Sequence, residues 1–157
     1  MTKSNHIDNK GNIQMVDVGS KSSTNRKAIA SGCIHLNKET LKSINDGLNK
    51  KGDVLVVSQI AGIQAVKKTS SLIPLTHVLD INSVNIDFKL YPDKIECTSE
   101  VNCYGKTGAE IEALCAVQIS LLTIYDMCKY IDKNMIISQI QLISKEGGKS
   151  GEFKREE

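Results

Sequence analysis

Residues 84–103 read VNIDFKLYPDKIECTSEVNC, and this stretch decides the fold. Apolar residues alternate with polar ones from Val84 to Leu90, which is the period of a strand with one buried face. Pro92-Asp93-Lys94 is a turn sequence, and the alternation resumes from Ile95 to Cys103. The stretch therefore predicts a β-hairpin whose apolar face covers a core.

The strongest helical pattern in the chain follows the hairpin, from Ala109 to Tyr130. We expect one apolar stripe along this helix, formed by Ile111, Leu114, Cys115, Gln118, Leu121, Leu122 and Tyr125. Beyond it, alternation from Gln139 to Lys145 predicts a last strand. Residues 147–157 are typical of a glycine- and charge-rich tail.

The part of the chain before the hairpin predicts a tail, a loop and a strand. Residues 1–14 are polar and unpatterned, so we expect a flexible N-terminal tail. Ser20 to Lys27 is polar and basic, which is typical of a loop. Ala28 to Leu36 predicts a short strand.

Two helices are expected between this strand and the hairpin. Asn37 can cap the first, whose apolar pattern begins at Leu41. Asp53 can cap the second, and one of its faces would be formed by Val54, Val57, Ala61 and Ala65. A buried strand over residues 54–57 is the alternative, because β-branched residues crowd there.

The order of these elements is β-α-(α)-β-β-α-β, the split βαβ pattern of ferredoxin-like folds. The predicted fold class is therefore α+β, a ferredoxin-like antiparallel sheet with helices packed on one face. A chain of 157 residues, 40% of them hydrophobic, is long enough to build one core. We expect residues 15–157 to form a single domain.

Charge and cysteine content narrow the classes of protein. The net charge of +2 is too small to indicate nucleic-acid or membrane binding by bulk electrostatics. The five cysteines are odd in number and no pair has C-x-x-C spacing, so we expect reduced thiols and no protein metal site. The N-terminus lacks the apolar run of a signal peptide, and we expect no membrane-spanning stretch. These features predict a soluble, cytoplasmic protein.

Two Gly-Lys motifs could place backbone N–H groups and a lysine near a phosphate. They are Gly105-Lys106-Thr107-Gly108 and Gly147-Gly148-Lys149-Ser150. Neither is a Walker A loop, because Glu100 and Ile143 stand where that loop requires its first glycine. A plain flexible turn is the alternative for both.

Several titratable side chains are candidates for chemistry, each with a structural alternative. Asp126 and Lys129 are three residues apart on the long helix, so they form either a surface ion pair or an acid/base pair in a cleft. Glu112 lies in the first turn of that helix, where a carboxylate also complements the helix dipole. His77 follows a proline-containing segment, where a structural role is the alternative to catalysis or binding.

Several segments together resemble one family. They are Met15-Val16-Asp17-Val18, Lys51-Gly52-Asp53, Ile60-Ala61-Gly62-Ile63-Gln64-Ala65, Leu72-Ile73-Pro74-Leu75 with His77, Gly105-Lys106-Thr107-Gly108, Glu110-Ile111-Glu112-Ala113-Leu114, Leu122-Thr123-Ile124-Tyr125-Asp126-Met127-Cys128-Lys129 and Gly147-Gly148-Lys149-Ser150-Gly151. In order and spacing they resemble cyclic pyranopterin monophosphate synthase, the molybdenum cofactor biosynthesis protein C family. The resemblance runs from about Met15 to Phe153.

This resemblance implies an enzyme with one catalytic domain. Its members are phosphorus-oxygen lyases that convert 3′,8-cyclo-7,8-dihydro-GTP to cyclic pyranopterin monophosphate and pyrophosphate in molybdenum cofactor biosynthesis. The resemblance also implies a ferredoxin-like subunit in a homohexamer, a trimer of dimers with active sites at a subunit interface. It implies no resident cofactor, and it leaves open whether Mg²⁺ accompanies the substrate triphosphate.

The resemblance further implies roles for individual residues. Asp126 would be the catalytic acid/base, with Lys129 one turn away and Lys51 arriving from another loop. Substrate contacts would come from Leu75, Thr76, His77, Ile111 and Glu112, and phosphate contacts from Arg26 and Lys149. The family commonly carries cysteine where this chain has Thr76, so no role that requires a thiol is expected there.

The main alternative is a non-catalytic, ferredoxin-like nucleotide-binding module. An RNA-binding sheet displays stacking aromatic residues, and the hairpin strands contain only Phe88 and flanking tyrosines. A small scaffold oligomer is a second alternative, but it would have no use for clustered Lys, Asp and His residues.

Overall fold

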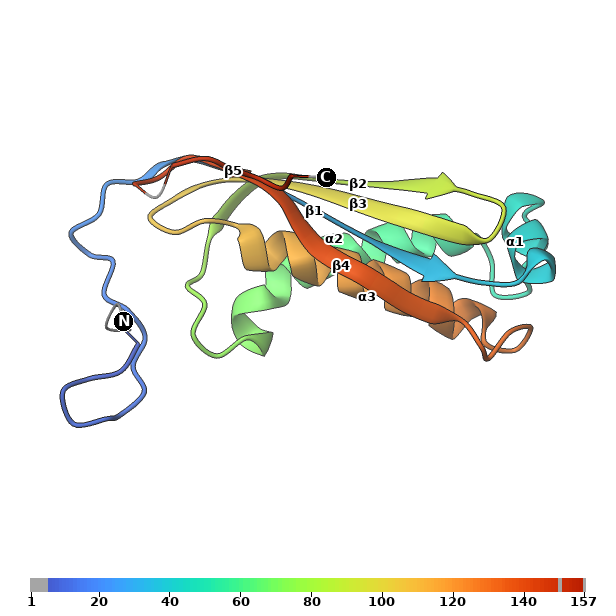
Figure 1. The fold of residues 1–157 in the computed structure, drawn as a ribbon, viewed down its shortest axis with the longest axis horizontal. Helices are drawn as coiled ribbons and strands as arrows, with labels where there is room; N and C mark the ends of the chain where they lie inside the picture. Colours follow the sequence, from blue (N-terminus) through green and yellow to red (C-terminus); the bar gives the residue numbers. More distant parts are fainter. Residues whose placement is uncertain (1–5, 150, 157) are drawn as a thin grey trace.

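The computed structural model describes residues 6–149 and 151–156, and it has one antiparallel sheet with two long helices on one face (Figure 1). The sheet has five strands in the order β2-β3-β1-β4-β5. The elements are β1 (Thr24–His35), α1 (Lys38–Asn45), α2 (Val54–Leu72), β2 (Asp80–Leu90), β3 (Lys94–Gly105), α3 (Glu110–Cys128), β4 (Ile136–Glu146) and β5 (Phe153–Lys154). The predicted α+β, ferredoxin-like fold is confirmed.

The hairpin quoted above is strands β2 and β3. Their register runs from Asp80 opposite Tyr104 to Leu90 opposite Ile95, and the N–H of Tyr91 donates to the Lys94 carbonyl across the turn. Alternate side chains of the hairpin, among them Ile86 and Val101, are buried against the helices. The period of two residues thus places one face of the hairpin in the core.

Both predicted helix caps are confirmed. The side chain of Asn37 accepts a hydrogen bond from the N–H of Thr40 at the start of α1. The Asp53 carboxylate accepts from the N–H groups of Leu55 and Val56 at the start of α2. The alternative strand over residues 54–57 is wrong, because capping starts a helix there that tertiary packing then extends to Leu72.

The predicted buried faces of the two long helices are confirmed only in part: Val54, Ala65 and Leu121 are buried, and other predicted positions are exposed. On α3, Ile111 and Leu122 are 39% and 53% exposed, whereas small residues such as Ala113 and Ala116 are fully buried. On α2, Val57 is exposed, and the buried positions include Ser58 and the other small residues Gly62, Ala65 and Thr69. Each helix packs against both the sheet and its neighbour, so close approach selects small residues rather than an apolar stripe.

Three boundaries differ from expectation. Strand β1 begins at Thr24, inside the predicted loop, because Thr24 pairs with Gly105 at the far end of β3. Strand β4 begins at Ile136, three residues before the predicted start at Gln139. The predicted tail contains strand β5, which pairs with Ser144 and Lys145.

The described part of the N-terminal segment forms a small turn. Ile7 and Ile13 make an antiparallel bridge, and the Asp8 carboxylate accepts from the N–H groups of Lys10 and Asn12. The flexibility expected for residues 1–14 stays a prediction.

Helix α3 is long and apolar enough to cross a membrane by length and composition, contrary to expectation. Its side chains nevertheless pack against the sheet, and Val117, Leu121 and Ile124 are fully buried. The core helix of an α+β domain has this composition because both its neighbours are apolar.

Candidate active site

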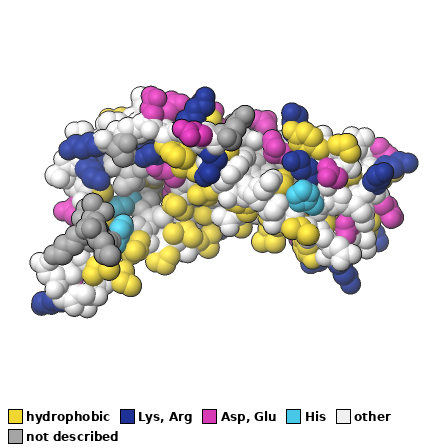
Figure 2. All heavy atoms as spheres, in the orientation of Figure 1, with side chains coloured by type: hydrophobic (Ala, Val, Ile, Leu, Met, Phe, Trp, Pro, Cys, Tyr) yellow, Lys and Arg dark blue, Asp and Glu magenta, His cyan; other side chains and the backbone are white. Residues whose placement is uncertain are grey.

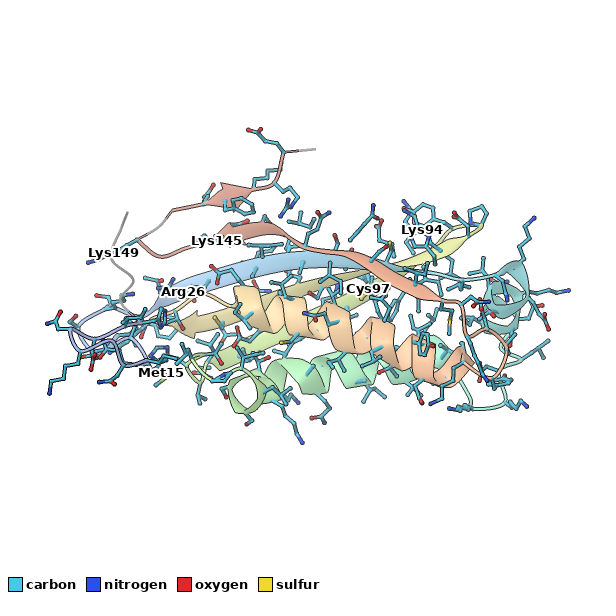
Figure 3. All side chains as sticks on the ribbon, turned by 60° about the horizontal axis from the view of Figure 1, so that its bottom comes forward. Met15, Arg26, Lys94, Cys97, Lys145 and Lys149 are labelled. Atoms are coloured by element: carbon cyan, nitrogen blue, oxygen red, sulfur yellow. The ribbon has the colours of Figure 1, made fainter. Side chains whose placement is uncertain are left out.

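Two cavities adjoin at the end of the molecule where α3 begins. Both are lined by Lys21, Thr107, Gly108 and Glu110. The first cavity, of about 550 Å³, also receives His77 and Glu112. The second, of about 620 Å³, receives Arg26, Lys145 and Lys149, which lie at the same end of the sheet in Figure 3.

The second cavity, here called the basic cavity, has a strong excess of positive charge. Among the described residues that line it, the charged ones are Lys21, Arg26, Lys106, Lys145, Lys149 and Glu110. Lys145 Nζ lies 3.5 Å from Glu110 Oε1, and Lys106 Nζ donates to the Gly19 carbonyl at 2.6 Å. Several cations converging on one hollow suit a ligand with several negative charges.

Arg26 is held rigidly in the basic cavity. Its Nε donates to the Gly105 carbonyl at 2.9 Å, and its Nη2 donates to the Lys106 carbonyl at 3.0 Å. Both carbonyls belong to the start of the connection between β3 and α3. Arg26 therefore ties strand β1 to the Gly-Lys motif that the sequence singles out, and three residues of this motif line the basic cavity: Lys106, Thr107 and Gly108.

The first cavity, here called the histidine cavity after His77, combines apolar and titratable groups. Leu75, Thr76 and Ile111 line it with His77 and Glu112. His77 Nε2 lies 2.9 Å from the Val16 carbonyl, which can only accept, so this nitrogen carries a proton. The Thr76 hydroxyl donates a hydrogen bond to the Ile73 carbonyl. This local contact does not depend on the cysteine that the family commonly has at this position.

Glu112 is the most deeply buried carboxyl group of the histidine cavity, at 4% exposure. Burial raises its pKa, its own backbone N–H opposes that rise, and the nearby charge of Glu110 adds to it. A carboxyl group held closer to its protonated form at neutral pH can donate a proton to a substrate.

Asp126, Lys51 and Lys129 form a separate cluster at the other end of α3, here called the aspartate cluster. Lys129 Nζ lies 2.8 Å from Asp126 Oδ1, and Lys51 Nζ lies 3.3 Å from Oδ2 and 2.9 Å from the Asp126 carbonyl. The hydrogen bonds from Lys129 and then Lys51 lower the pKa of Asp126. The predicted neighbourhood of these three residues is present in the structure.

Asn49 positions Lys51 within this cluster. Its side-chain oxygen accepts from the N–H of Lys51 at 2.9 Å, and its side-chain nitrogen donates to the Met127 carbonyl at 3.3 Å. The amide is nearly buried and joins the loop before α2 to the end of α3. No signal in the sequence identified this residue, because its contacts are with residues far along the chain.

The aspartate cluster and the two cavities do not meet within one chain. Glu112 and Asp126 are 14 residues apart on α3 (126 − 112), which corresponds to about 21 Å along the helix axis. The structure therefore brings Arg26, Lys149, His77 and Glu112 to one end of α3 and leaves Asp126 at the other.

Sequence reasoning assigned no individual role to three lysines of the basic cavity. Lys106 was visible as part of a Gly-Lys motif, and Lys21 lies in a segment recognised only as basic. Lys145 was assigned to a strand without a role, and only the pairing of β4 with β1 brings it to Glu110. Charge alone could not separate these lysines from ordinary surface lysines.

Comparison with known proteins shows the family of this chain. The model of the MoaC family matches residues 15–148. The chain belongs to the MoaC family. The match contains every predicted site residue except Lys149, which follows directly after it.

Named members of the MoaC family are similar over nearly the whole chain. The cyclic pyranopterin monophosphate synthase of Clostridium botulinum (strain Alaska E43 / Type E3) is 58% identical over 153 residues, covering 96% of each protein. The synthase of the same name from Peptoclostridium acidaminophilum is 52% identical over 151 residues, again 96% of each. That from Novosphingobium aromaticivorans is 53% identical over 152 residues, 97% of each.

Proposed function

We propose that this chain is a cyclic pyranopterin monophosphate synthase, a lyase of molybdenum cofactor biosynthesis. It converts 3′,8-cyclo-7,8-dihydro-GTP to cyclic pyranopterin monophosphate and releases pyrophosphate. The observation that carries the proposal is the basic cavity beside the histidine cavity, the two sharing Lys21 and Glu110. One ligand with a triphosphate at one end and a fused ring at the other would fill both.

The basic cavity binds the triphosphate and stabilises the departing pyrophosphate. Arg26 offers a planar, always charged guanidinium, and Lys106, Lys145 and Lys149 add point charges around it. Charge accumulates on the bridging oxygen as the bond to pyrophosphate breaks. Cations fixed in advance stabilise that charge without reorganisation, which is the largest electrostatic contribution that such a site can make.

The histidine cavity holds the ring system and supplies proton donors and acceptors during ring opening and ring closure. Glu112, with its raised pKa, serves as a proton donor to the ring. His77 presents its second ring nitrogen as an acceptor when the ring is neutral, since Nε2 is engaged with Val16. Thr76 and Leu75 shape the wall beside it.

Asp126, Lys51 and Lys129 act as acid/base groups that another subunit supplies. The separation along α3 supports this arrangement, because one substrate molecule cannot reach both ends of the helix within a chain. A lysine near other cations and a carboxylate near two lysines can both exchange protons with a bound substrate. The complete site would then lie at an interface in a homohexamer, a trimer of dimers.

Exposed apolar residues supply a surface for such an assembly. On the helix side of the molecule, hydrophobic side chains gather in the centre of the view in Figure 2. Val56, Val57 and Ile60 of α2 are exposed, Ile60 at 56%, and Leu122 of α3 is exposed as well. A contiguous apolar surface of this kind is typical of subunit contacts.

The proposed enzyme has no resident cofactor. Among residues 6–149 and 151–156, no three His, Cys, Asp or Glu side chains lie together as a metal site. A Mg²⁺ ion that enters with the triphosphate is compatible with Glu110 at the cavity wall. Turnover with and without a chelator tests whether the reaction needs it.

A cytoplasmic location is also part of the proposal. The cysteines of the described residues are all free, and four of them are buried. Reduced thiols suit a reducing compartment.

The decisive experiment supplies purified protein with 3′,8-cyclo-7,8-dihydro-GTP and follows pyrophosphate release together with the pterin product. Stoichiometric formation of both is the expected result. Tight binding of the substrate without pyrophosphate release would identify a nucleotide-binding module and refute the enzyme.

A further inference from the structure

The connection from β4 to β5 passes directly over Arg26. Gly147 and Gly148 have positive φ angles of 88° and 81° and line the approach to the guanidinium. A Cβ atom added to Gly148 would overlap Arg26 Nη1 and lie 2.9 Å from Cζ and 3.2 Å from Nη2. Those distances are shorter than ordinary van der Waals contacts, so no side chain fits there while Arg26 keeps its place.

The opposite edge of the same guanidinium is already engaged. Nε and Nη2 donate to the carbonyls of Gly105 and Lys106, which orients the guanidinium plane. The backbone of Gly148 lies close to the Nη1 end. The arginine is therefore confined between two loops that are more than 40 residues apart in the chain (148 − 105 = 43).

We propose that Gly148 is a positioning residue for phosphate binding: its missing side chain lets Arg26 lie against the Gly105 and Lys106 carbonyls. This inference rests on the proposed function, in which Arg26 binds the triphosphate. Arginine recognises phosphate through a planar pair of donors. Nε and one N–H of Nη2 are engaged by the two carbonyls, so the Nη1–Nη2 edge would supply that pair, and the orientation of the plane governs affinity.

Two neighbouring glycines help to distinguish the displacement of Arg26 from the strain of placing a side chain at a positive φ angle. Gly151 also has a positive φ, 71°, but a Cβ there meets no described atom within 4 Å. A Cβ on Gly147 would overlap the Asn25 carbonyl, which is rigid strand backbone. Alanine at position 151 should therefore cost only the strain of a positive φ angle. Alanine at position 148 has the same strain and also displaces Arg26.

The displacement at position 148 is local. The atom that the new Cβ meets is the end of a flexible side chain, so Arg26 moves aside while the strands keep their register. The two hydrogen bonds to Gly105 and Lys106 are then lost. The expected variant is folded and deficient in anion binding.

The test measures the affinity for pyrophosphate by calorimetry in Gly148→Ala and, as the matched control, Gly151→Ala. We expect Gly148→Ala to weaken binding roughly tenfold or more and Gly151→Ala to stay within about twofold. In turnover, Gly148→Ala should raise KM more than it lowers kcat. Equal affinities for the two variants would overturn the proposal.

A second comparison establishes that the effect passes through Arg26. In an Arg26→Ala background, adding Gly148→Ala should leave pyrophosphate affinity unchanged, because the group it displaces is gone. A further loss in that background would assign the effect to Lys149 or to the loop itself, and would overturn the proposal. Gly148→Asn, which carries a Cβ but tolerates positive φ, should weaken binding as Gly148→Ala does if the alanine variant folds poorly.

These measurements also separate failure here from failure of the proposed function. Wild-type protein that binds pyrophosphate but does not turn over the cyclised GTP would refute the function. The pyrophosphate affinities of the glycine variants would still decide the role of Gly148.

Discussion

Glu112 and Asp126 illustrate how the surroundings of a carboxyl group set its chemistry. Both lie on α3, but Glu112 is buried and Asp126 is exposed between two lysines. Burial raises the pKa of Glu112, and the Lys129 and Lys51 hydrogen bonds lower the pKa of Asp126. A pair of carboxyl groups with opposed pKa shifts suits one proton donor and one acceptor.

Replacing Glu112 with glutamine should stabilise the fold while impairing catalysis. The pKa of Glu112 is raised in the folded state, so its ionised form costs stability at neutral pH, and that cost disappears as the pH falls below the ordinary value of 4.5. Glu112→Gln should therefore melt at a higher temperature than wild type at pH 7, and the two should converge in acid. Turnover should fall about 100-fold or more. A lower melting temperature at pH 7 would contradict the burial argument.

The pKa of Asp126 should depend more on Lys129 than on Lys51. The hydrogen bond from Lys129 is the larger cause of the lowered pKa, so Lys129→Met should move the titration of Asp126 further toward 3.8 than Lys51→Met does. The NMR chemical shift of the Asp126 carboxyl carbon, followed through a pH titration, measures this pKa in both variants. A larger shift in Lys51→Met than in Lys129→Met would refute this order.

Because Asp126 is exposed, Asp126→Ala should change the melting temperature little while abolishing turnover.

At the scale of elements, close contacts between helices and loops hold the site residues in place. The buried amide of Asn49 joins the loop that carries Lys51 to the end of α3. At the helix–helix contact, Gly62 of α2 faces the Ser120 hydroxyl and the Ala116 carbonyl of α3. The residues that make these contacts, Asn49 and Gly62, are buried although neither has a large apolar side chain.

Asn49→Ala should loosen Lys51 and lower the free energy of unfolding. It removes the acceptor of the Lys51 N–H and the donor to the Met127 carbonyl, a loss of about 1–3 kcal/mol. The pKa of Asp126 should rise in the same variant. Tyr130→Phe, which removes only an exposed acceptor for the Lys50 N–H at 3.2 Å, is the control. We expect it to stay within about 0.5 kcal/mol in denaturant unfolding.

Gly62→Ala should destabilise the protein although alanine favours helix. The helix propensity gain is about 1 kcal/mol, but the added Cβ would overlap the Ser120 hydroxyl and Ile86 and lie 3.1 Å from the Ala116 carbonyl. Overpacking of this kind costs roughly 1–3 kcal/mol, so overpacking should prevail in urea unfolding. Gln64→Ala, on the exposed side of α2, should not destabilise. Unfolding of Gly62→Ala at higher urea than wild type would contradict the close helix contact.

At the scale of the whole molecule, one chain holds two incomplete halves of a site. The basic cavity and the histidine cavity lie where α3 begins, and the aspartate cluster lies where it ends. The homohexamer proposed above would place the end of one α3 beside the cavities of another subunit. Assembly would then be a condition of activity as well as of stability.

Complementation between inactive variants tests this arrangement. Asp126→Ala and Arg26→Ala should each be inactive alone, and subunits mixed by unfolding and refolding together should recover activity. With equal amounts and random assembly, about a quarter of the interfacial sites would carry both intact residues. No recovery in mixed oligomers of confirmed composition would place both residues in the same chain's site. Sedimentation of the wild type measures the oligomeric state directly.

The sequence by itself determined what depends on near neighbours. Alternation from Val84 to Cys103 specified the hairpin, and Asn37 and Asp53 specified two helix starts, because strand period and capping are local. The resemblance carried by short motifs predicted the family, and that prediction is confirmed. It also selected Arg26, His77 and Glu112, which the structure places at the two adjoining cavities.

Only the tertiary structure decided which groups meet. Periodicity could not tell which sides of α2 and α3 are buried, because each helix has two neighbours and their close approach requires small residues such as Gly62. Pairing of β1 with β4 brings Lys145 to the basic cavity, and the turn at Gly148 confines Arg26 there. The separation of Asp126 from Glu112 follows from the rise of a straight helix. Convergence of distant segments is a property of packing, and no local pattern encodes it.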